Sequence, residues 1–347
     1  MVSEIEGGGP GNDGPRDDGP RADGPRGDGP RDDGPRPVAV DLDEQGRLLD
    51  PATGLPVRGD RLAAHLADRL RMPAAAGDVY VHVPGWQTTT RPADRAATDL
   101  TDTARALLAA RPALYPGITA GYRPWCVVVR WPSASPPTLA GYRRIRDRAA
   151  AMSAAAGGSA GEVLARLLGC LDAQRGRPAG EPGGDRYLHL LGHSFGGRFL
   201  CEAVRRAAAD RQPPFTVDSM LLLQPAAPRE AYATCFPALF PAPGRSTAPL
   251  RGPLVLAHAR GDAPPEPGAL RGPLGGAAAA VRRSAVPLLP VDVPYHRRAL
   301  ESGIVNVLGG AAHRAAPPAR SLPACGHGDL HHPELAHLLL SLAALAR

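Results

Sequence analysis

The chain contains no lysine, and arginine supplies all 40 of its basic residues. The formal net charge is +6, which on its own would suggest nucleic acid or an anionic surface as a partner. Arginine is abundant here together with 41 glycines and 40 prolines, a combination typical of biased nucleotide composition. No tight arginine cluster with interleaved aromatic residues is present. We therefore expect no nucleic-acid binding.

Cysteine is sparse and irregularly placed. The five cysteines are odd in number, scattered, and form no CxxC pair. This pattern argues against a disulfide framework and against a zinc site, and it predicts buried free thiols. The positions are Cys126, Cys170, Cys201, Cys235 and Cys325.

Aromatic residues and long apolar runs are also scarce. Aromatics make up 4% of the chain against 43% hydrophobic residues, which predicts an aliphatic, alanine-rich core. The N-terminus lacks the basic and apolar regions of a signal peptide, and no uninterrupted apolar run reaches the length of a membrane span. These absences predict a soluble, cytoplasmic protein without a membrane span. Its oligomeric state is left open.

The first 36 residues have almost no apolar side chains. Residues 12–36 are five copies of a pentapeptide, NDGPR, DDGPR, ADGPR, GDGPR and DDGPR. Such a segment buries too little apolar surface to offset the entropy lost on ordering. We expect residues 1–36 to be a disordered low-complexity tail and residues 37–347 to form a single domain.

Beyond the tail, short apolar segments alternate with helical ones. The alternation predicts an α/β fold whose central sheet is mostly parallel, with helices on both faces. Predicted strands lie at 78–86 (ending in a Pro-Gly turn), 125–131, 187–192, 220–224 and 253–259. Predicted helices cover 60–70, 94–110, 142–152, 162–174, 198–210 and 333–346. The segments 133–160 and 263–320 are candidates for a lid or an acyl pocket, and the second has no predicted elements.

Ser194 lies in Gly192-His193-Ser194-Phe195-Gly196, a match to G-x-S-x-G. The motif alone is weak in a chain this rich in glycine. Its context is stronger, because an apolar strand ends at Leu191 and a helical segment begins near Gly197. A strand-to-helix turn is the setting that a nucleophile elbow requires. We therefore predict Ser194 as a nucleophile whose backbone is strained.

A serine nucleophile needs a base, and the base needs an acid to orient it. In proteins with this elbow the acid precedes the histidine, and both follow the serine. Asp262 comes just after the strand at 253–259, at the end where parallel sheets bind ligands, so it is the predicted acid. Asp292, in VPLLPVDVPY, stays open as an alternative. Asp218 precedes its strand and is expected at the opposite edge.

The histidines near the C-terminus supply the base. His327 stands between two glycines, in a loop that can reach over the sheet, and it is the predicted base. His332 is the alternative, and His331 is also in range. His337 lies within the last predicted helix, where packing or solvent exposure is expected. A three-histidine metal site is disfavoured because the i, i+4 helical spacing is missing, and we expect no metal or other cofactor.

The oxyanion needs two backbone donors. The N–H of Phe195, at the start of the helix, is the first. The second is expected from the loop after an early strand, where Gly85 lets the chain turn inward and places the N–H of Trp86. The Trp86 side chain can pack at the same time.

These residues give the chain a family resemblance. From about residue 77 to the C-terminus it resembles the α/β-hydrolase superfamily, and more narrowly a group of bacterial serine-hydrolase-like proteins related to esterases and lipases. The resemblance is carried by the strand entering HVPGW, by VVVRWPS with Tyr142 and Arg148, by GHSFGGRFL and by the closing HGDLHHPELA. It departs from the usual His-Gly pair of the oxyanion segment, since Val83-Pro84 separates His82 from Gly85.

The resemblance implies a triad and a reaction. Ser194 would be the nucleophile, His327 the base and Asp262 the acid, with Phe195 and Trp86 as oxyanion donors. The expected function is a serine hydrolase that cleaves an ester or related acyl bond of a small molecule through an acyl-enzyme, without a cofactor. A thioesterase or acyltransferase on the same scaffold is an alternative. A noncatalytic binding protein with this fold is another.

Overall fold

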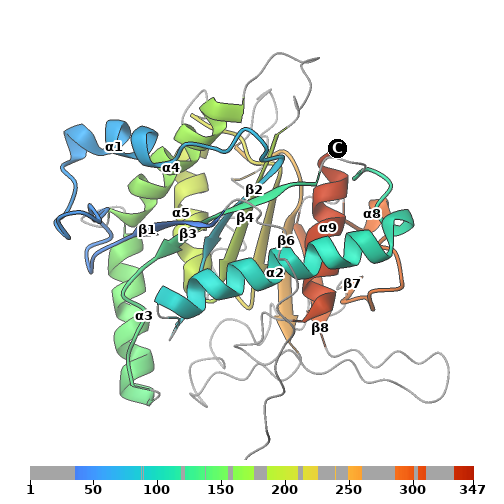
Figure 1. The fold of residues 1–347 in the computed structure, drawn as a ribbon. Helices are drawn as coiled ribbons and strands as arrows, with labels where there is room; N and C mark the ends of the chain where they lie inside the picture. The colour runs from blue at the N-terminus through green and yellow to red at the C-terminus, as the bar shows by residue number, and fades with distance from the viewer. Residues whose placement is uncertain are drawn as a thin grey trace, which may run out of the picture. The chain divides into compact units, whose positions relative to one another are not determined.

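The apolar strand segments assemble into one sheet in the computed structural model (Figure 1). The structure describes residues 36–86, 88, 90–118, 122–136, 138–154, 159–175, 186–209, 214–225, 239, 249–259, 286–300, 304–309 and 332–347. The predicted tail, residues 1–36, lies outside this set except for Arg36.

The sheet has eight strands in the order β1-β3-β2-β4-β5-β6-β8-β7, and every strand pair is parallel. Strands buried on both faces read as continuous apolar runs, which is why the segments from β2 to β6 could be recognised. The strands are β1 (Val38–Asp41), β2 (Asp78–Val83), β3 (Pro124–Arg130), β4 (Tyr187–His193), β5 (Ser219–Leu223), β6 (Leu254–Ala259), β7 (Val286–Pro287) and β8 (Ile304–Gly309).

Helices cover both faces of the sheet, so the predicted α/β fold with a mostly parallel sheet is confirmed. One face carries α1 (Leu62–Arg69), α3 (Leu139–Ser153), α4 (Ala160–Arg175) and α5 (Gly196–Ala209). The other carries α2 (Thr90–Ala110) and α9 (Pro333–Leu345). Shorter helical segments are η1 (Gly59–Arg61), η2 (Pro112–Leu114) and α8 (Arg297–Leu300).

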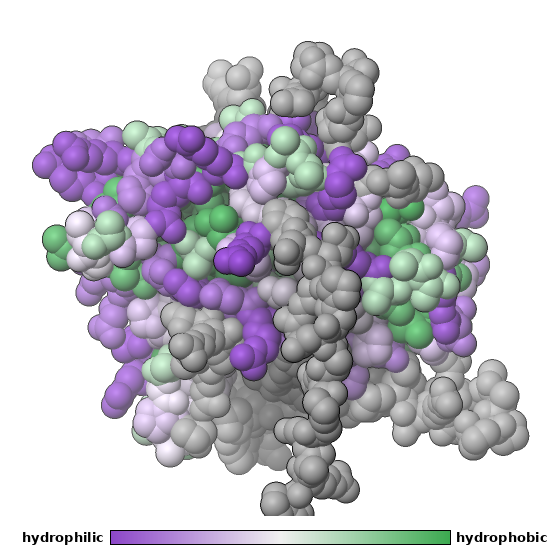
Figure 2. Space-filling model, viewed as in Figure 1, coloured by the Kyte–Doolittle hydropathy of each residue, from purple (hydrophilic) through white to green (hydrophobic). Residues whose placement is uncertain are grey.

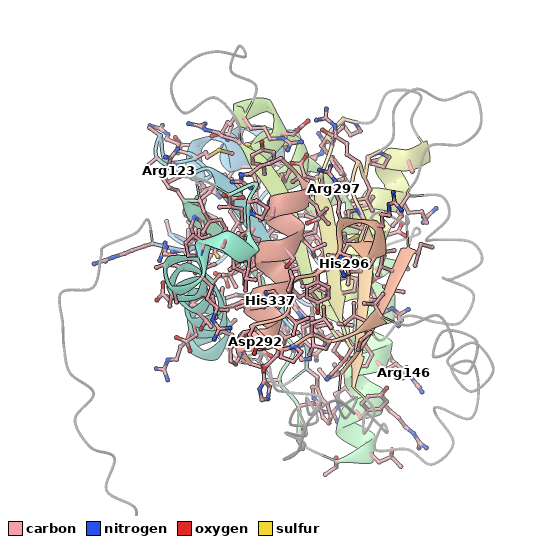
Figure 3. The ribbon with its side chains drawn as sticks, turned by 90° about the vertical axis from the view of Figure 1, so that its right-hand side faces the viewer. Arg123, Arg146, Asp292, His296, Arg297 and His337 are labelled. Carbon is pink, nitrogen blue, oxygen red and sulfur yellow. The ribbon has the colours of Figure 1, made fainter. Side chains whose placement is uncertain are left out.

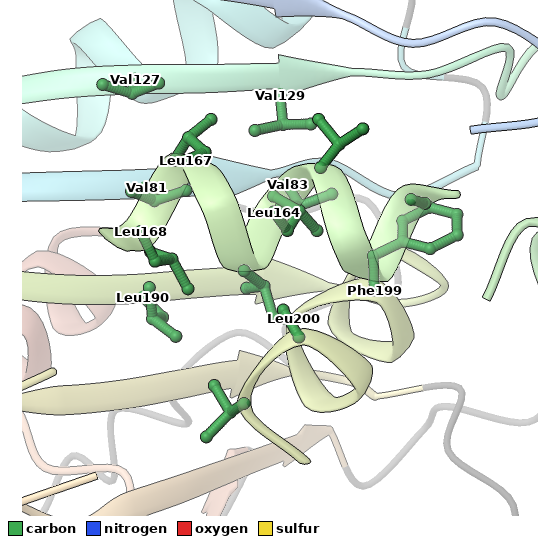
Figure 4. Close-up of a cluster of buried hydrophobic side chains, with 14 of the residues drawn as sticks. Val81, Val83, Val127, Val129, Leu164, Leu167, Leu168, Leu190, Phe199 and Leu200 are labelled. Carbon is green, nitrogen blue, oxygen red and sulfur yellow. The ribbon is translucent and has the colours of Figure 1, made fainter. Parts of the chain in front are cut away.

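Two apolar cores hold the layers together, because alternate residues of each strand point to opposite faces. In the first, Val81 and Val83 of β2 and Leu190 of β4 pack against Leu164 of α4 and Leu200 of α5 (Figure 4). In the second, side chains of α2 and α9 cover the opposite face of the same strands. The edge-on view shows α9 in red on one side and α3 in pale green beyond the sheet (Figure 3).

The outer surface of the helices is polar. Hydrophilic residues gather at the upper left of Figure 2, where α1 lies, and hydrophobic residues are interspersed elsewhere on this face. Among the described helices, none combines the length and the apolar composition needed to cross a membrane.

The connections of β2 and β4 define where a ligand can bind. These strands are neighbours, yet β2 leads to α2 on one face and β4 leads to α5 on the other. The point at which two neighbouring strands lead to opposite faces, at their carboxyl ends, is where open parallel sheets usually bind ligands. The loop after β2 and the turn after β4 both lie at this point.

Several elements differ from the sequence prediction. Strand β8 was not predicted, because its sequence, IVNVLG, lies inside the Gly- and Pro-rich stretch 263–320, for which the sequence predicts no helix or strand. The segment around Asp292 forms only the two-residue strand β7 followed by a turn. Within 133–160, residues 139–153 form α3, which buries Ile145, Ala149 and Met152 in the first core.

Candidate active site

Ser194 occupies a sharp turn between β4 and α5. It directly follows His193, the last residue of β4, and α5 begins two residues later at Gly196. Its φ is +50°, a left-handed conformation that costs free energy for any residue with a side chain. Its backbone N–H donates to the Leu223 carbonyl of β5 at 2.9 Å, which ties the strained turn to the sheet.

The motif glycines allow two backbones to approach closely. A Cβ on Gly196 would lie 2.5 Å from the Pro84 carbonyl oxygen and would also overlap the Val83 carbonyl. A Cβ on Gly192 would lie 2.7 Å from the Cα of Gly197. Only glycine fits at these positions without a shift of the backbone, so the first turn of α5 can reach the ends of β4 and β2.

The loop after β2 lies directly against Ser194. A Cβ on Gly85 would be 2.9 Å from the Cβ of Ser194 and 2.6 Å from Nδ1 of His193. The next residue is Trp86, so its backbone is adjacent to the serine turn. Within the described part of the chain, no acceptor takes the backbone N–H of either Trp86 or Phe195. Both predicted oxyanion donors therefore remain available.

The side chains of the two donor residues pack around one tyrosine. The Trp86 ring meets Tyr142 of α3 edge-on at 5.7 Å between centroids, and Tyr142 meets the Phe195 ring at 5.6 Å. The Trp86 Nε1–H donates to the Ser135 hydroxyl at 2.7 Å. Trp86 thus packs through its side chain while its backbone N–H stays open, so the two expected roles are compatible.

A second loop braces the first. After β3, the Trp131 Nε1–H donates to the Pro84 carbonyl at 2.8 Å, and the Ser133 hydroxyl donates to the Thr88 carbonyl at 2.8 Å. Sequence reasoning missed Ser133 and Ser135. The available signal was the Ser-Pro-rich stretch after a buried strand, because neighbouring parallel strands bring their following loops together.

Two histidines are buried beneath the turn. His82 of β2 is 1% exposed, and no described group hydrogen-bonds to either ring nitrogen. Burial, with a smaller contribution from His193, lowers the pKa of His82 to about 3. His82 is therefore neutral near pH 7 and too weak a base to accept the serine proton.

The predicted acid and base, Asp262 and His327, lie outside the described residues, as does His331. The elements that lead to them are described. Strand β6 ends at Ala259, paired with Gly309 of β8, and α9 begins at Pro333. Both segments that carry the predicted partners therefore leave the carboxyl edge of the sheet, the edge where Ser194 lies.

The alternative acid, Asp292, is described. It is exposed in the turn after β7 and lies near His337 of α9 (Figure 3). Burial lowers the pKa of His337, and the negative charge of Asp292 is a small contribution in the opposite direction. The alternative base, His332, caps the start of α9, with its Nδ1 3.9 Å from a carboxylate oxygen of Glu334. No hydrogen bond between Asp292 and His332 is present in the described part of the chain.

Two other predictions are confirmed. The Asp218 carboxylate accepts from the Leu188 N–H at 2.8 Å and pairs with Arg175, at the amino edge of the sheet. His337 has a packing role, because its ring is held between the Tyr115 hydroxyl at 2.6 Å and the Val293 carbonyl at 2.9 Å. Among the described residues, no three histidine, cysteine or acidic side chains group as metal ligands.

The amino edge holds a serine, histidine and aspartate that the sequence did not reveal. The Ser219 hydroxyl is 2.8 Å from Nδ1 of His189, whose Nε2 is 3.4 Å from the Asp78 carboxylate. Arg347 binds both oxygens of that carboxylate, at 3.0 and 2.8 Å. Arg347 and His189 hold the pKa of Asp78 below its ordinary value, against the effect of burial. All three members of the array are buried, and Ser194 at the opposite edge is likewise only 1% exposed.

No family model and no curated protein matches this chain. The function is therefore inferred from the residues at the carboxyl edge. Their arrangement offers a strained serine with two backbone N–H groups near it, at the point where the chains leaving β2 and β4 diverge. Such a constellation can attack a carbonyl carbon and stabilise the negative oxygen that forms.

Proposed function

We propose that this protein is a serine hydrolase of the α/β-hydrolase superfamily that cleaves an ester or related acyl bond. The observation that carries the proposal is the conformation of Ser194, at φ +50° between a parallel strand and a helix. This is the geometry of a nucleophile elbow, which lifts the hydroxyl above the carboxyl edge of a sheet. The close contact of Gly85 with Ser194 supports it, because the same loop supplies the second oxyanion donor.

The proposed reaction has two halves. Ser194 Oγ attacks the carbonyl carbon while His327 accepts its proton, and Asp262 holds the imidazole and stabilises its charged form. The N–H groups of Phe195 and Trp86 bind the oxyanion of the tetrahedral intermediate. The histidine then protonates the leaving group. Water, deprotonated by the same histidine, finally releases the acid. His332 and Asp292 are the alternative base and acid.

Labelling by a fluorophosphonate probe tests the proposal. We expect the full-length protein to be labelled and Ser194→Ala to lose all labelling. Ser153→Ala is a matched control, because the Ser153 hydroxyl bonds only to the Ala149 carbonyl of its own helix. Ser219→Ala is a second control from the buried array. Absence of labelling in well-folded protein would favour a noncatalytic binding role on the same scaffold.

The partners of Ser194 can be assigned by the same reagent. Labelling rates are compared for His327→Ala and His332→Ala, and for Asp262→Asn and Asp292→Asn. Loss of rate in only one member of each pair identifies the base and the acid. Product analysis with p-nitrophenyl esters and thioesters, with and without an added alcohol, separates hydrolysis from thioester cleavage and acyl transfer.

A further inference from the structure

Arg198 is a half-buried arginine in the first turn of α5, four residues beyond Ser194. Its backbone N–H donates to the Phe195 carbonyl at 3.1 Å, so it belongs to the same turn as an oxyanion donor. No carboxylate of the described part of the chain pairs with its guanidinium. Burial lowers the pKa of Arg198, which means that the charged form is held where water is partly excluded.

The acids near Arg198 are engaged elsewhere. Glu202 is the only acidic residue of α5 and is one turn away, but it binds Arg205 at 2.7 Å and Arg206 at 3.0 Å. On the facing helix α3, Asp147 pairs with its exposed neighbour Arg146 at 3.0 Å. Among the described residues, Arg198 therefore has no counter-ion to offset its desolvation, which is costly for a structural residue.

A second arginine, Arg146 of α3, lies close enough to Arg198 for its charge to act on it. Tyr142 and Arg146 are four residues apart on α3, and therefore on the same face of the helix. Both act electrostatically on Arg198, and the positive charge of Arg146 opposes that of Arg198. Tyr142 is also the residue that contacts the rings of Phe195 and Trp86. The two like charges thus lie beside the aromatic cluster that surrounds the serine turn.

Arg148, on α3 like Arg146, is an arginine with a structural role and serves as a comparison for Arg198. Its guanidinium donates to the Pro132 carbonyl at 2.8 Å and pairs with Glu44 at 2.8 Å. Arg198 has neither kind of anchor. A guanidinium near another guanidinium, half-buried and without an acid, is the arrangement that binds carboxylate and phosphate groups.

We propose that Arg198, assisted by Arg146, binds an anionic group carried by the acyl substrate, a carboxylate or a phosphate. The proposal rests on the hydrolase function and names the class of substrate for it. Arg198 is the third residue of α5 and only four residues after Ser194, so the anionic group would lie a short chain away from the carbonyl that Ser194 attacks. With a neutral acyl chain of the same length, Arg198 would have no counter-ion among the described residues, and Arg146 would have only Asp147.

Matched esters test this proposal. We compare mono-p-nitrophenyl adipate with p-nitrophenyl hexanoate, and include p-nitrophenyl 5-phosphonopentanoate to separate carboxylate from phosphate recognition. The wild-type kcat/KM should be at least about 10-fold higher for one anionic ester than for hexanoate. Arg198→Gln and Arg146→Gln should each lower this ratio by about 10-fold or more. Arg144 is an exposed residue of α3, the helix that carries Arg146. Arg144→Gln should leave unchanged the ratio and the kcat/KM values from which it is formed.

A binding measurement separates the failure of this proposal from that of the hydrolase function. Adipic acid monoamide should bind wild-type protein in calorimetric titration, bind Arg198→Gln at least about 10-fold more weakly, and bind better than hexanamide. The melting temperature of Arg198→Gln should not fall, since the variant removes an unpaired charge. Labelled Ser194 with no preference for either anionic ester would overturn the anion site alone. Lack of labelling together with amide binding that depends on Arg198 would overturn only the hydrolase function.

Discussion

The two edges of the sheet each place a serine beside a buried histidine, and they differ in almost everything else. At the amino edge, Ser219, His189 and Asp78 follow one another as in a hydrolase triad, yet Ser219 is an ordinary strand residue sealed in the core. At the carboxyl edge, Ser194 is held in a strained turn. In the first arrangement Ser219 is hydrogen-bonded to His189 and Asp78 to Arg347, whereas Nε2 of His189 makes no hydrogen bond to a described group.

The comparison shows that the order of polar side chains is not enough to make a catalytic site. A nucleophile also needs oxyanion donors and an opening for the substrate. At the carboxyl edge, close backbone approach puts the Trp86 and Phe195 backbones next to Ser194, whose side chain is itself buried. At the amino edge, Ser219 lies within a strand, and the Asp78 carboxylate is paired with Arg347 and His189.

The largest effect on stability is expected at Gly196, where the carboxyl edge depends on close approach of two backbones. Gly196→Ala would press a methyl group into the Val83 and Pro84 carbonyls and should cost about 3 kcal/mol of unfolding free energy, with loss of fluorophosphonate labelling. Gly59→Ala is the control, since its added methyl meets nothing within 4 Å and should change stability little. Chemical denaturation measures both. Equal stability of the two variants would contradict the close approach.

An intermediate effect on stability is expected from His82, whose ring nitrogens have no hydrogen-bond partner among the described residues. The pKa of His82 is about 3 in the folded protein and about 6.5 in the unfolded chain, so the unfolded state binds an extra proton between these values. The contribution of neutral His82 to the free energy of unfolding is fully present above pH 6.5 and is lost as the pH falls toward 3. At pH 5 the loss is about 2 kcal/mol.

Replacing the ring tests this dependence. His82→Leu should be at least as stable as wild type at pH 7, because two unsatisfied buried nitrogens are removed. It should lose about 2 kcal/mol less than wild type between pH 7 and pH 5. Urea denaturation at the two pH values checks the difference, and parallel pH curves for the two proteins would show that His82 is not buried neutral.

The smallest expected effect is a change in unfolding free energy that has opposite signs for glycine substitutions at Ser194 and Ser219. Ser194→Gly should raise the unfolding free energy by up to about 1 kcal/mol, because glycine adopts φ +50° without strain. Ser219→Gly should lower it by about 1 kcal/mol, because it removes the hydroxyl that bonds His189 and puts glycine in a strand. Thermal unfolding of both variants is the measurement. Destabilisation of the same size in both would mean that the Ser194 turn stores no strain.

Much of the carboxyl edge was predictable from the sequence. An apolar run, a glycine-bounded serine and a helical segment lie within about twenty consecutive residues, so local pattern alone predicted the elbow. Strand β8 was not predicted, because its six residues lie in a Gly- and Pro-rich stretch without a helical neighbour to mark the alternation. Asp262 and His327 stay predictions, since their segments lie outside the described residues.

The sequence by itself determined the α/β class, the turn at Ser194 and the edge to which it belongs, because these follow from periodicity and from glycine at short range. Tertiary structure alone decided which distant residues meet. It buried Asp78, His189 and Ser219 in one array, gave His82 no hydrogen-bond partner among the described residues, and packed α3 against α5, so that the charge of Arg146 acts on Arg198. Such pairings depend on packing between segments far apart in the chain, which no local pattern encodes.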